Sequence, residues 1–173
     1  MTQLLPRAYY RIRAGIHIRH WRGRRIHSPF VYGVVREVFM KKGVVGDREL
    51  YGILHSAGIR GKNAALLQNL YNYCGMERYA VIDGNTAPVL PVPFVERTLC
   101  IVLSSTGPET ACETARNMEG SGGILAVVSP HREKKRRRAT ENIRKKVRCV
   151  SIDRQVLKLY FFNPKLQPRH YRI

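Results

Sequence analysis

The chain has 173 residues, enough for one domain of ordinary size with a hydrophobic core. With 44% hydrophobic residues, 14 glycines and 9 prolines, its composition excludes collagen-like, low-complexity and wholly disordered proteins. The formal net charge of +19 favours acidic partners, with nucleic acid first and an anionic membrane surface second.

The four cysteines lie far apart without a Cys-x-x-Cys pair, so neither a zinc site nor a disulfide framework is predicted. The histidines are scattered, and no metal site is expected from them. The basic N-terminus is not followed by an apolar signal core, and no run reaches the roughly 18 apolar residues that span a bilayer. We therefore expect a cytoplasmic protein with free thiols and no transmembrane segment.

Residues 1–26 are rich in arginine and contain no acid. Leu5, Tyr9, Ile12 and Ile16 fall at helical spacing and predict a basic amphipathic helix. A solvated helix and a functional one are both open interpretations. Attachment of this helix to a membrane surface is a further alternative, although it lacks large apolar anchors beyond a few aromatic residues.

The next part of the chain has the apolar spacing of helices. Each predicted helix begins at a capping residue and ends near a glycine: Ser28 to about Lys41, Asp47 to Gly58, and Asn63 to Gly75. We expect residues 1–77 to form a helical segment that packs on the sheet of the remaining chain, residues 78–173.

From Arg78 onward, short apolar strands alternate with helices. The predicted strands are 78–83, 98–103, 124–128, 147–152 and 156–162, and the predicted helices are 108–118 and Ser129 to about Lys146. Continuous apolar strands between helices are typical of an α/β fold whose parallel sheet is covered on both faces. The last two strands are close enough in sequence to form an antiparallel hairpin.

Ligands of open α/β sheets bind beyond the carboxyl ends of the strands. Two such ends carry polar residues here, Asp83-Gly84-Asn85 and Ser104-Ser105-Thr106-Gly107. The second leads into a helix and could hold an anion at the helix N-terminus, although ordinary turn chemistry explains both segments as well. No catalytic motif is present, and no catalytic residue is predicted.

Several segments together resemble a bacterial group of class I S-adenosylmethionine-dependent methyltransferases, close to the O-methyltransferases. The resemblance covers roughly residues 20–173 and rests on the order of its motifs. These are His27-Ser28-Pro29-Phe30-Val31, Leu67-Gln68-Asn69-Leu70-Tyr71-Asn72-Tyr73 leading into Arg78–Gly84, Gly123–Val128, Val150–Asp153, Leu159–Phe162 and the ending His170–Ile173.

The family has a seven-stranded sheet of order 3-2-1-4-5-7-6, and this chain departs from it where the cofactor binds. Only residues 84–97 separate the strands that resemble the first and fourth, too few for two further strands. The resemblance therefore implies a Rossmann-like sheet of about five strands, ordered 1-4-5-7-6. It implies that S-adenosylmethionine, if bound at all, would contact Asp83, Gly84, Asn85, Ser104 and Ser105.

Three functions follow from these observations. The first is a methyltransferase-like protein without catalytic activity that serves as a binding or scaffold domain, alone or in a homo- or hetero-oligomer. The second is a basic RNA- or DNA-binding module, and the third an active methyltransferase with an altered pocket. Candidate nucleic-acid contacts lie in two basic segments: Arg22, Arg24, Arg25, Lys134, Lys135, Arg136, Arg137, Arg138 and Lys145.

Overall fold

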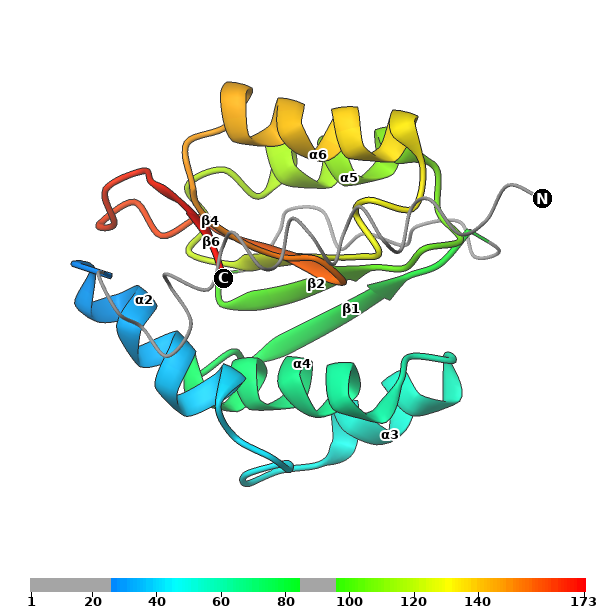
Figure 1. Ribbon diagram of the computed structural model, residues 1–173, viewed down its shortest axis with the longest axis vertical. Helices are drawn as coiled ribbons and strands as arrows, with labels where there is room; N and C mark the ends of the chain where they lie inside the picture. Colours follow the sequence, from blue (N-terminus) through cyan, green and yellow to red (C-terminus); the bar gives the residue numbers. More distant parts are fainter. Residues whose placement is uncertain (1–25, 85–95) are drawn as a thin grey trace. The chain divides into compact units, whose positions relative to one another are not determined.

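The computed structural model describes residues 26–84 and 96–173 of the chain, which divides into two compact units (Figure 1). The first unit ends at Tyr73 and includes Arg172 and Ile173, and the second comprises Cys74–Tyr171. The basic helix expected before residue 26 lies outside the described residues.

The described part of the first unit is helical. Ser28 begins its first helix as predicted, because the Ser28 hydroxyl accepts a hydrogen bond from the Val31 amide at 3.3 Å. The helix predicted to end at Gly58 stops at Ser56, and Gly58 has a φ of +79°, which suits a glycine. The helices are α2 (Pro29–Val34), the π-helix η2 (Val35–Phe39), α3 (Glu49–Ser56) and α4 (Gly61–Tyr73).

Three amide side chains of α4 hold the loop that connects η2 to α3 and the first turn of α3. Asn69 accepts a hydrogen bond from the Val45 amide and donates one to the Gly43 carbonyl, both at 2.8 Å. Asn72 donates to the Val45 carbonyl at 2.7 Å, and Gln68 accepts from the amide of Tyr51 at 2.8 Å. These contacts explain why polar residues stand on the buried side of α4.

The second unit contains an open, mixed sheet with the strand order β1-β2-β3-β5-β4-β6. Neighbouring pairs β1–β2 and β2–β3 are parallel, whereas β5 runs antiparallel to both β3 and β4. The fold class is therefore α/β. The strands are β1 (Arg78–Ile82), β2 (Thr98–Val102), β3 (Ile124–Val128), β4 (Val150–Arg154), β5 (Leu157–Phe161) and β6 (His170–Arg172).

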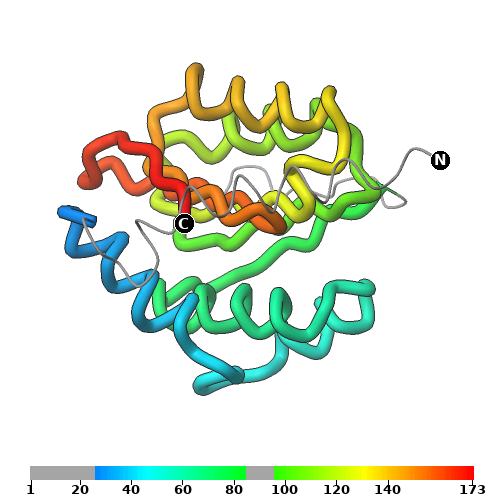
Figure 2. Tube along the Cα trace, in the orientation of Figure 1, coloured from blue at the N-terminus to red at the C-terminus, as the bar shows by residue number. Residues whose placement is uncertain are grey.

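Two helices, α5 (Pro108–Asn117) and α6 (Lys134–Lys146), lie side by side on one face of this sheet (Figures 1 and 2). Cys112 of α5 contacts the carbonyl oxygen of Ala139 of α6 at 3.4 Å. Near the ends of both helices, Glu119 accepts a hydrogen bond from the Arg148 amide at 2.8 Å. The core under the helices includes Val102, Leu125, Val127, Ile143 and Tyr160.

Two predictions about this unit were wrong. The sheet has six strands rather than about five, because β6 is added beside β4 through a hydrogen bond from the Ser151 amide to the Arg169 carbonyl at 2.9 Å. The basic helix begins at Lys134 and not at Ser129, since Ser129 has a φ of +50° and its amide bonds to the Val156 carbonyl.

Candidate functional site

The carboxyl ends of β1 and β2 lie directly against each other. The Leu103 amide donates to the Ile82 carbonyl at 2.9 Å, and the Gly84 amide donates to the Ser105 hydroxyl at 3.1 Å. A methyl group on Gly84 would collide with the carbonyl oxygen of Ser105. The predicted cofactor residues Gly84 and Ser105 are thus brought together. The glycine is needed because the backbone of Ser105 lies too close to leave space for a side chain at position 84.

The remaining predicted cofactor residues lie around this contact. Asp83 is half-buried and already takes part in an interaction. Ser104 is half-buried, next to the exposed Ser105. Asn85 lies outside the described residues.

The N-terminus of α5, which the sequence offers as an anion site, carries a carboxylate of the chain. A Cβ atom on Gly107 would lie 3.6 Å from the Glu109 Oε2 atom. A negative side chain in the first turn interacts favourably with the helix dipole. An added anion would therefore meet the charge of Glu109 at this helix end.

Arg136 closes the same edge of the sheet above β2 and β3. Its guanidinium group donates hydrogen bonds to the carbonyl oxygens of Thr106 at 2.8 Å, Leu103 at 2.7 Å and Val128 at 3.2 Å. The residue is only 2% exposed. The Arg136 guanidinium thus provides hydrogen-bond donors for carbonyl oxygens at and beyond the ends of β2 and β3.

The prediction that Arg136 contacts nucleic acid is therefore corrected. Its charge is directed into the protein, and burial lowers the pKa of Arg136 from its ordinary value. The Nε atom of Arg136 is buried without a hydrogen-bond partner among the described residues. Arg136 supports the fold, and it fills space at the edge where ligands of open α/β sheets bind.

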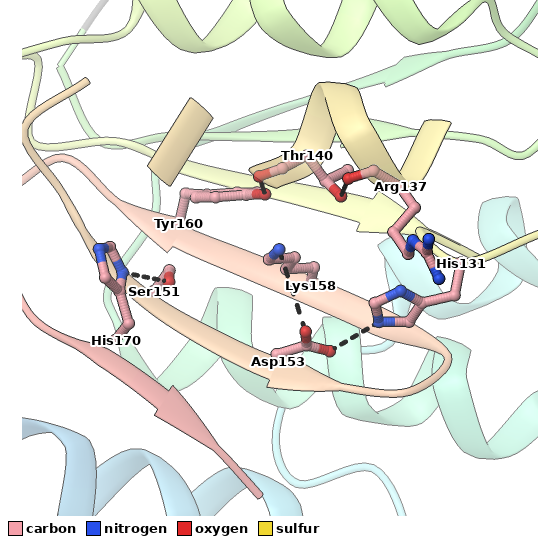
Figure 3. A network of polar contacts seen from close by, with 8 residues as sticks. All are labelled: His131, Arg137, Thr140, Ser151, Asp153, Lys158, Tyr160 and His170. Carbon is pink, nitrogen blue, oxygen red and sulfur yellow. Dashed lines mark hydrogen bonds and ion pairs between the residues drawn. The ribbon is translucent and has the colours of Figure 1, made fainter. Parts of the chain in front are cut away.

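A second polar cluster lies near the turn between β4 and β5 (Figure 3). The Asp153 carboxylate contacts His131 Nε2 at 3.0 Å and the buried Lys158 Nζ at 3.9 Å. Asp153 and Lys158 face each other in the β4–β5 register. Sequence reasoning missed this cluster, because 22 residues separate His131 from Asp153 and no motif spacing connects them.

His170 attaches β6 to its neighbours (Figure 3). Its Nδ1 atom lies 2.7 Å from the hydroxyl of the buried Ser151, and its side chain also forms a hydrogen bond with the backbone of Arg144. Partial burial of the ring, with the nearby cations Arg144 and Lys158, lowers the pKa of His170 to about 4.

This pKa predicts that the protein loses stability as the pH falls. Between about pH 6.5 and pH 4 the unfolded chain protonates His170 and the folded chain does not, so the free energy of unfolding decreases through that interval. The residue as a whole keeps much of its contact with solvent despite the partial burial of the ring, and solvent screening limits the loss to at most about 1 kcal/mol. Urea unfolding of wild-type protein and H170Q at about pH 7 and pH 4.5 measures it. Equal pH dependence in both proteins would contradict the prediction.

The exposed surface of α6 carries a stripe of cations that we call the α6 face. At 100° per residue its members cover about a third of the helix circumference and extend for about 18 Å along its axis. All of them are exposed. They are Lys134, Lys135, Arg138, Lys145 and Lys146.

The predicted nucleic-acid contacts thus fall into three groups. Lys134, Lys135, Arg138 and Lys145 share the α6 face, and Arg137 is half-buried beside it. Arg136 is buried on the opposite side of the helix. Arg22, Arg24 and Arg25 lie outside the described residues.

In the described part of the chain, the charge of the α6 face is not neutralised by ion pairs. Within residues 26–84 and 96–173, none of its five cations lies within ion-pair distance of a carboxylate. Two acidic residues lie in or next to α6. Glu133 is exposed just before the helix, and Glu141 is half-buried within it. Clustered cations of this kind attract polyanions, which release condensed counterions when they bind.

The described residues contain no group of three or more histidine, cysteine or acidic residues that could hold a metal ion. All four cysteines are free, and burial raises the pKa of Cys100 to about 12 and that of Cys149 to about 11. These thiols are therefore poor nucleophiles at neutral pH. No helix in the described part of the chain is long and apolar enough to cross a membrane.

Comparison of the chain with protein-family models, with curated proteins and with solved structures finds no match. The arrangement of its own residues is therefore the basis for a functional conclusion.

Proposed function

We propose that the chain is a non-catalytic, methyltransferase-like domain that binds the phosphate backbone of nucleic acid through the α6 face. The observation that carries the proposal is the stripe of five exposed cations without ion-pair partners in the described structure. Phosphate contacts supply most of the affinity in sequence-independent binding, and they require only such a surface.

The sheet supports the methyltransferase-like part of the proposal. Its order β1-β2-β3-β5-β4 corresponds to 1-4-5-7-6 when the strands are numbered as in the family that the sequence resembles. The antiparallel β5 between β3 and β4 corresponds to the last strand of that family. The short β6 is additional to this pattern.

The edge of the sheet supports the non-catalytic part. In open α/β folds a cofactor lies beyond the carboxyl ends of the strands, and the turn after the first strand must let it approach. Here the backbone of Ser105 is in contact with Gly84, and the guanidinium group of Arg136 is bonded to the ends of β2 and β3. A cofactor would have to displace these internal contacts.

The salt dependence of binding tests the proposal. We expect the purified chain to bind a fluorescently labelled oligonucleotide duplex. For five phosphate contacts, log K should fall with log salt concentration with a slope of about −4 or steeper. Fluorescence anisotropy over a range of salt concentrations measures this slope. A slope near zero, or no binding at low salt, would refute the electrostatic interface.

Calorimetric titration with S-adenosylmethionine tests the non-catalytic part separately. We expect no heat of binding at cofactor concentrations up to the millimolar range. Micromolar binding would show that the internal contacts at Gly84 and Arg136 open, and that the chain has to be tested for methyl transfer.

A further inference from the structure

The C-terminal part of the chain carries only positive charge. No aspartate or glutamate follows Asp153, whereas five lysine or arginine residues do. Two of these, Lys165 and Arg169, are exposed in the segment between β5 and β6. Figure 1 shows this segment as a red loop that projects beyond the strands.

Hydrogen bonds hold the backbone in place at the two cationic residues of this segment. The side chain of Asn163 accepts a hydrogen bond from the Lys165 amide at 2.9 Å and forms an Asx turn. At the other end of the segment, the Arg169 carbonyl accepts a bond from the Ser151 amide at 2.9 Å. The Arg169 guanidinium lies 5.8 Å from the centre of the Tyr171 ring, at cation–π distance.

This segment ends beside α6. His170, which follows Arg169 directly, is hydrogen-bonded to the backbone of Arg144 in the last turn of α6. Arg144 is half-buried, and β4, to which the segment is bonded through Ser151, begins at Val150 shortly after α6 ends at Lys146. Two sets of cations, the α6 face and the pair Lys165 and Arg169, therefore adjoin at the C-terminal end of α6.

The other flank of the α6 face has a different character. There α6 packs against α5, whose exposed residues include Glu109 and Glu113 as well as Arg116. The contact between Cys112 and Ala139 places this partly acidic helix along the flank of the α6 face. Positive charge thus continues toward the C-terminal segment, and on the α5 side it meets two carboxylates.

The side chains of this surface also limit which nucleic acid it suits. Neither α6 nor residues 163–169 contain an aromatic residue. Single strands gain about 1–3 kcal/mol for each base that stacks on an aromatic side chain, and neither of these two segments offers such a gain. In a duplex the bases are stacked internally, and the phosphates of two strands are presented across a groove.

On the basis of the proposed function, we infer that the ligand of the α6 face is a double-stranded nucleic acid. One strand contacts the α6 face, and the phosphates of the second strand contact Lys165 and Arg169. The duplex is placed away from α5, because Glu109 and Glu113 would repel its backbone.

The test compares a DNA duplex of about 16 base pairs with each of its single strands, using fluorescence anisotropy at several salt concentrations. We expect the wild-type chain to bind the duplex at least tenfold more tightly than either strand. In K165Q/R169Q, the duplex slope should decrease in magnitude by about 1.8, because two contacts of about 0.9 each are removed. The slope for single strands should change by much less.

K42Q/R60Q is the matched control, because it removes two exposed cations from the other unit and leaves both cation sets intact. Single strands that bind as tightly as the duplex, or a duplex slope equally affected in K165Q/R169Q and the control, would overturn this inference. The proposed function is judged separately, by a variant of the α6 face. If that variant binds like wild type, the proposed function fails as well.

Discussion

Replacing Arg136 with alanine is expected to lower the free energy of unfolding by about 3 kcal/mol or more. The substitution removes the Arg136 donor from the carbonyl oxygens of Thr106 and Val128, while the Leu103 carbonyl keeps its hydrogen bonds from the Thr106 amide and hydroxyl. Each buried polar group that loses its partner costs about 1–3 kcal/mol, partly offset because a cation no longer has to be buried. Urea denaturation followed by circular dichroism measures the change.

Three further variants separate the causes of this loss. R138A removes an exposed cation two residues away and should change stability by no more than about 0.5 kcal/mol. R136K retains the charge but not the planar set of donors, so we expect an intermediate loss. R136M fills similar space without charge, and if it is as stable as wild type, the strand-end carbonyls do not depend on Arg136.

Removing four cations from the α6 face is expected to weaken nucleic-acid binding roughly a thousandfold at 0.1 M salt, because each lost phosphate contact removes about 0.9 from the salt slope. The variant is K134Q/K135Q/R138Q/K145Q. Glutamine has nearly the helix propensity of lysine and arginine, and the four side chains are exposed, so α6 should remain folded. Fluorescence anisotropy with the same duplex measures the affinity and the slope.

A control of equal charge separates the site from the overall field of the protein. K42Q/R48Q/R60Q/K62Q also removes four exposed cations, all from the first unit, and both variants reduce the formal net charge of +19 by four. We expect the control to retain most of the affinity. Equal losses in both variants would mean that net charge alone attracts the nucleic acid and that the α6 face is not its site.

The sequence predicted most helices and strands because the signals for them are local. Ser28 and Pro29 indicate the start of α2 through hydrogen bonding and a fixed backbone angle, which need no distant partner. The fully buried strands β2 and β3 are apolar along their whole length and could be recognised for that reason. The short β6 has no such pattern, and its pairing depends on Ser151 and Arg169, which are far apart in sequence.

The candidate site likewise combines features that local sequence predicts with features that depend on packing. A run of basic residues predicts a charged helix, but it does not say which side of the helix packs on the sheet. Arg136 lies four residues before Thr140 and seven before Ile143, and all three are buried. This spacing is the signal that places Arg136 on the buried side, although its charge by itself suggests a surface position.

The sequence by itself thus determined the composition of each element, the α/β class, and the presence of a basic helix that ends near Lys146. Tertiary structure decided which of the basic side chains reach solvent and which bond to strand ends. It also brought Gly84 against Ser105, and His170 against Ser151 and Arg144. The reason is physical: local propensity and periodicity act within a few residues, whereas burial and hydrogen-bond partners depend on elements that meet only in the folded chain.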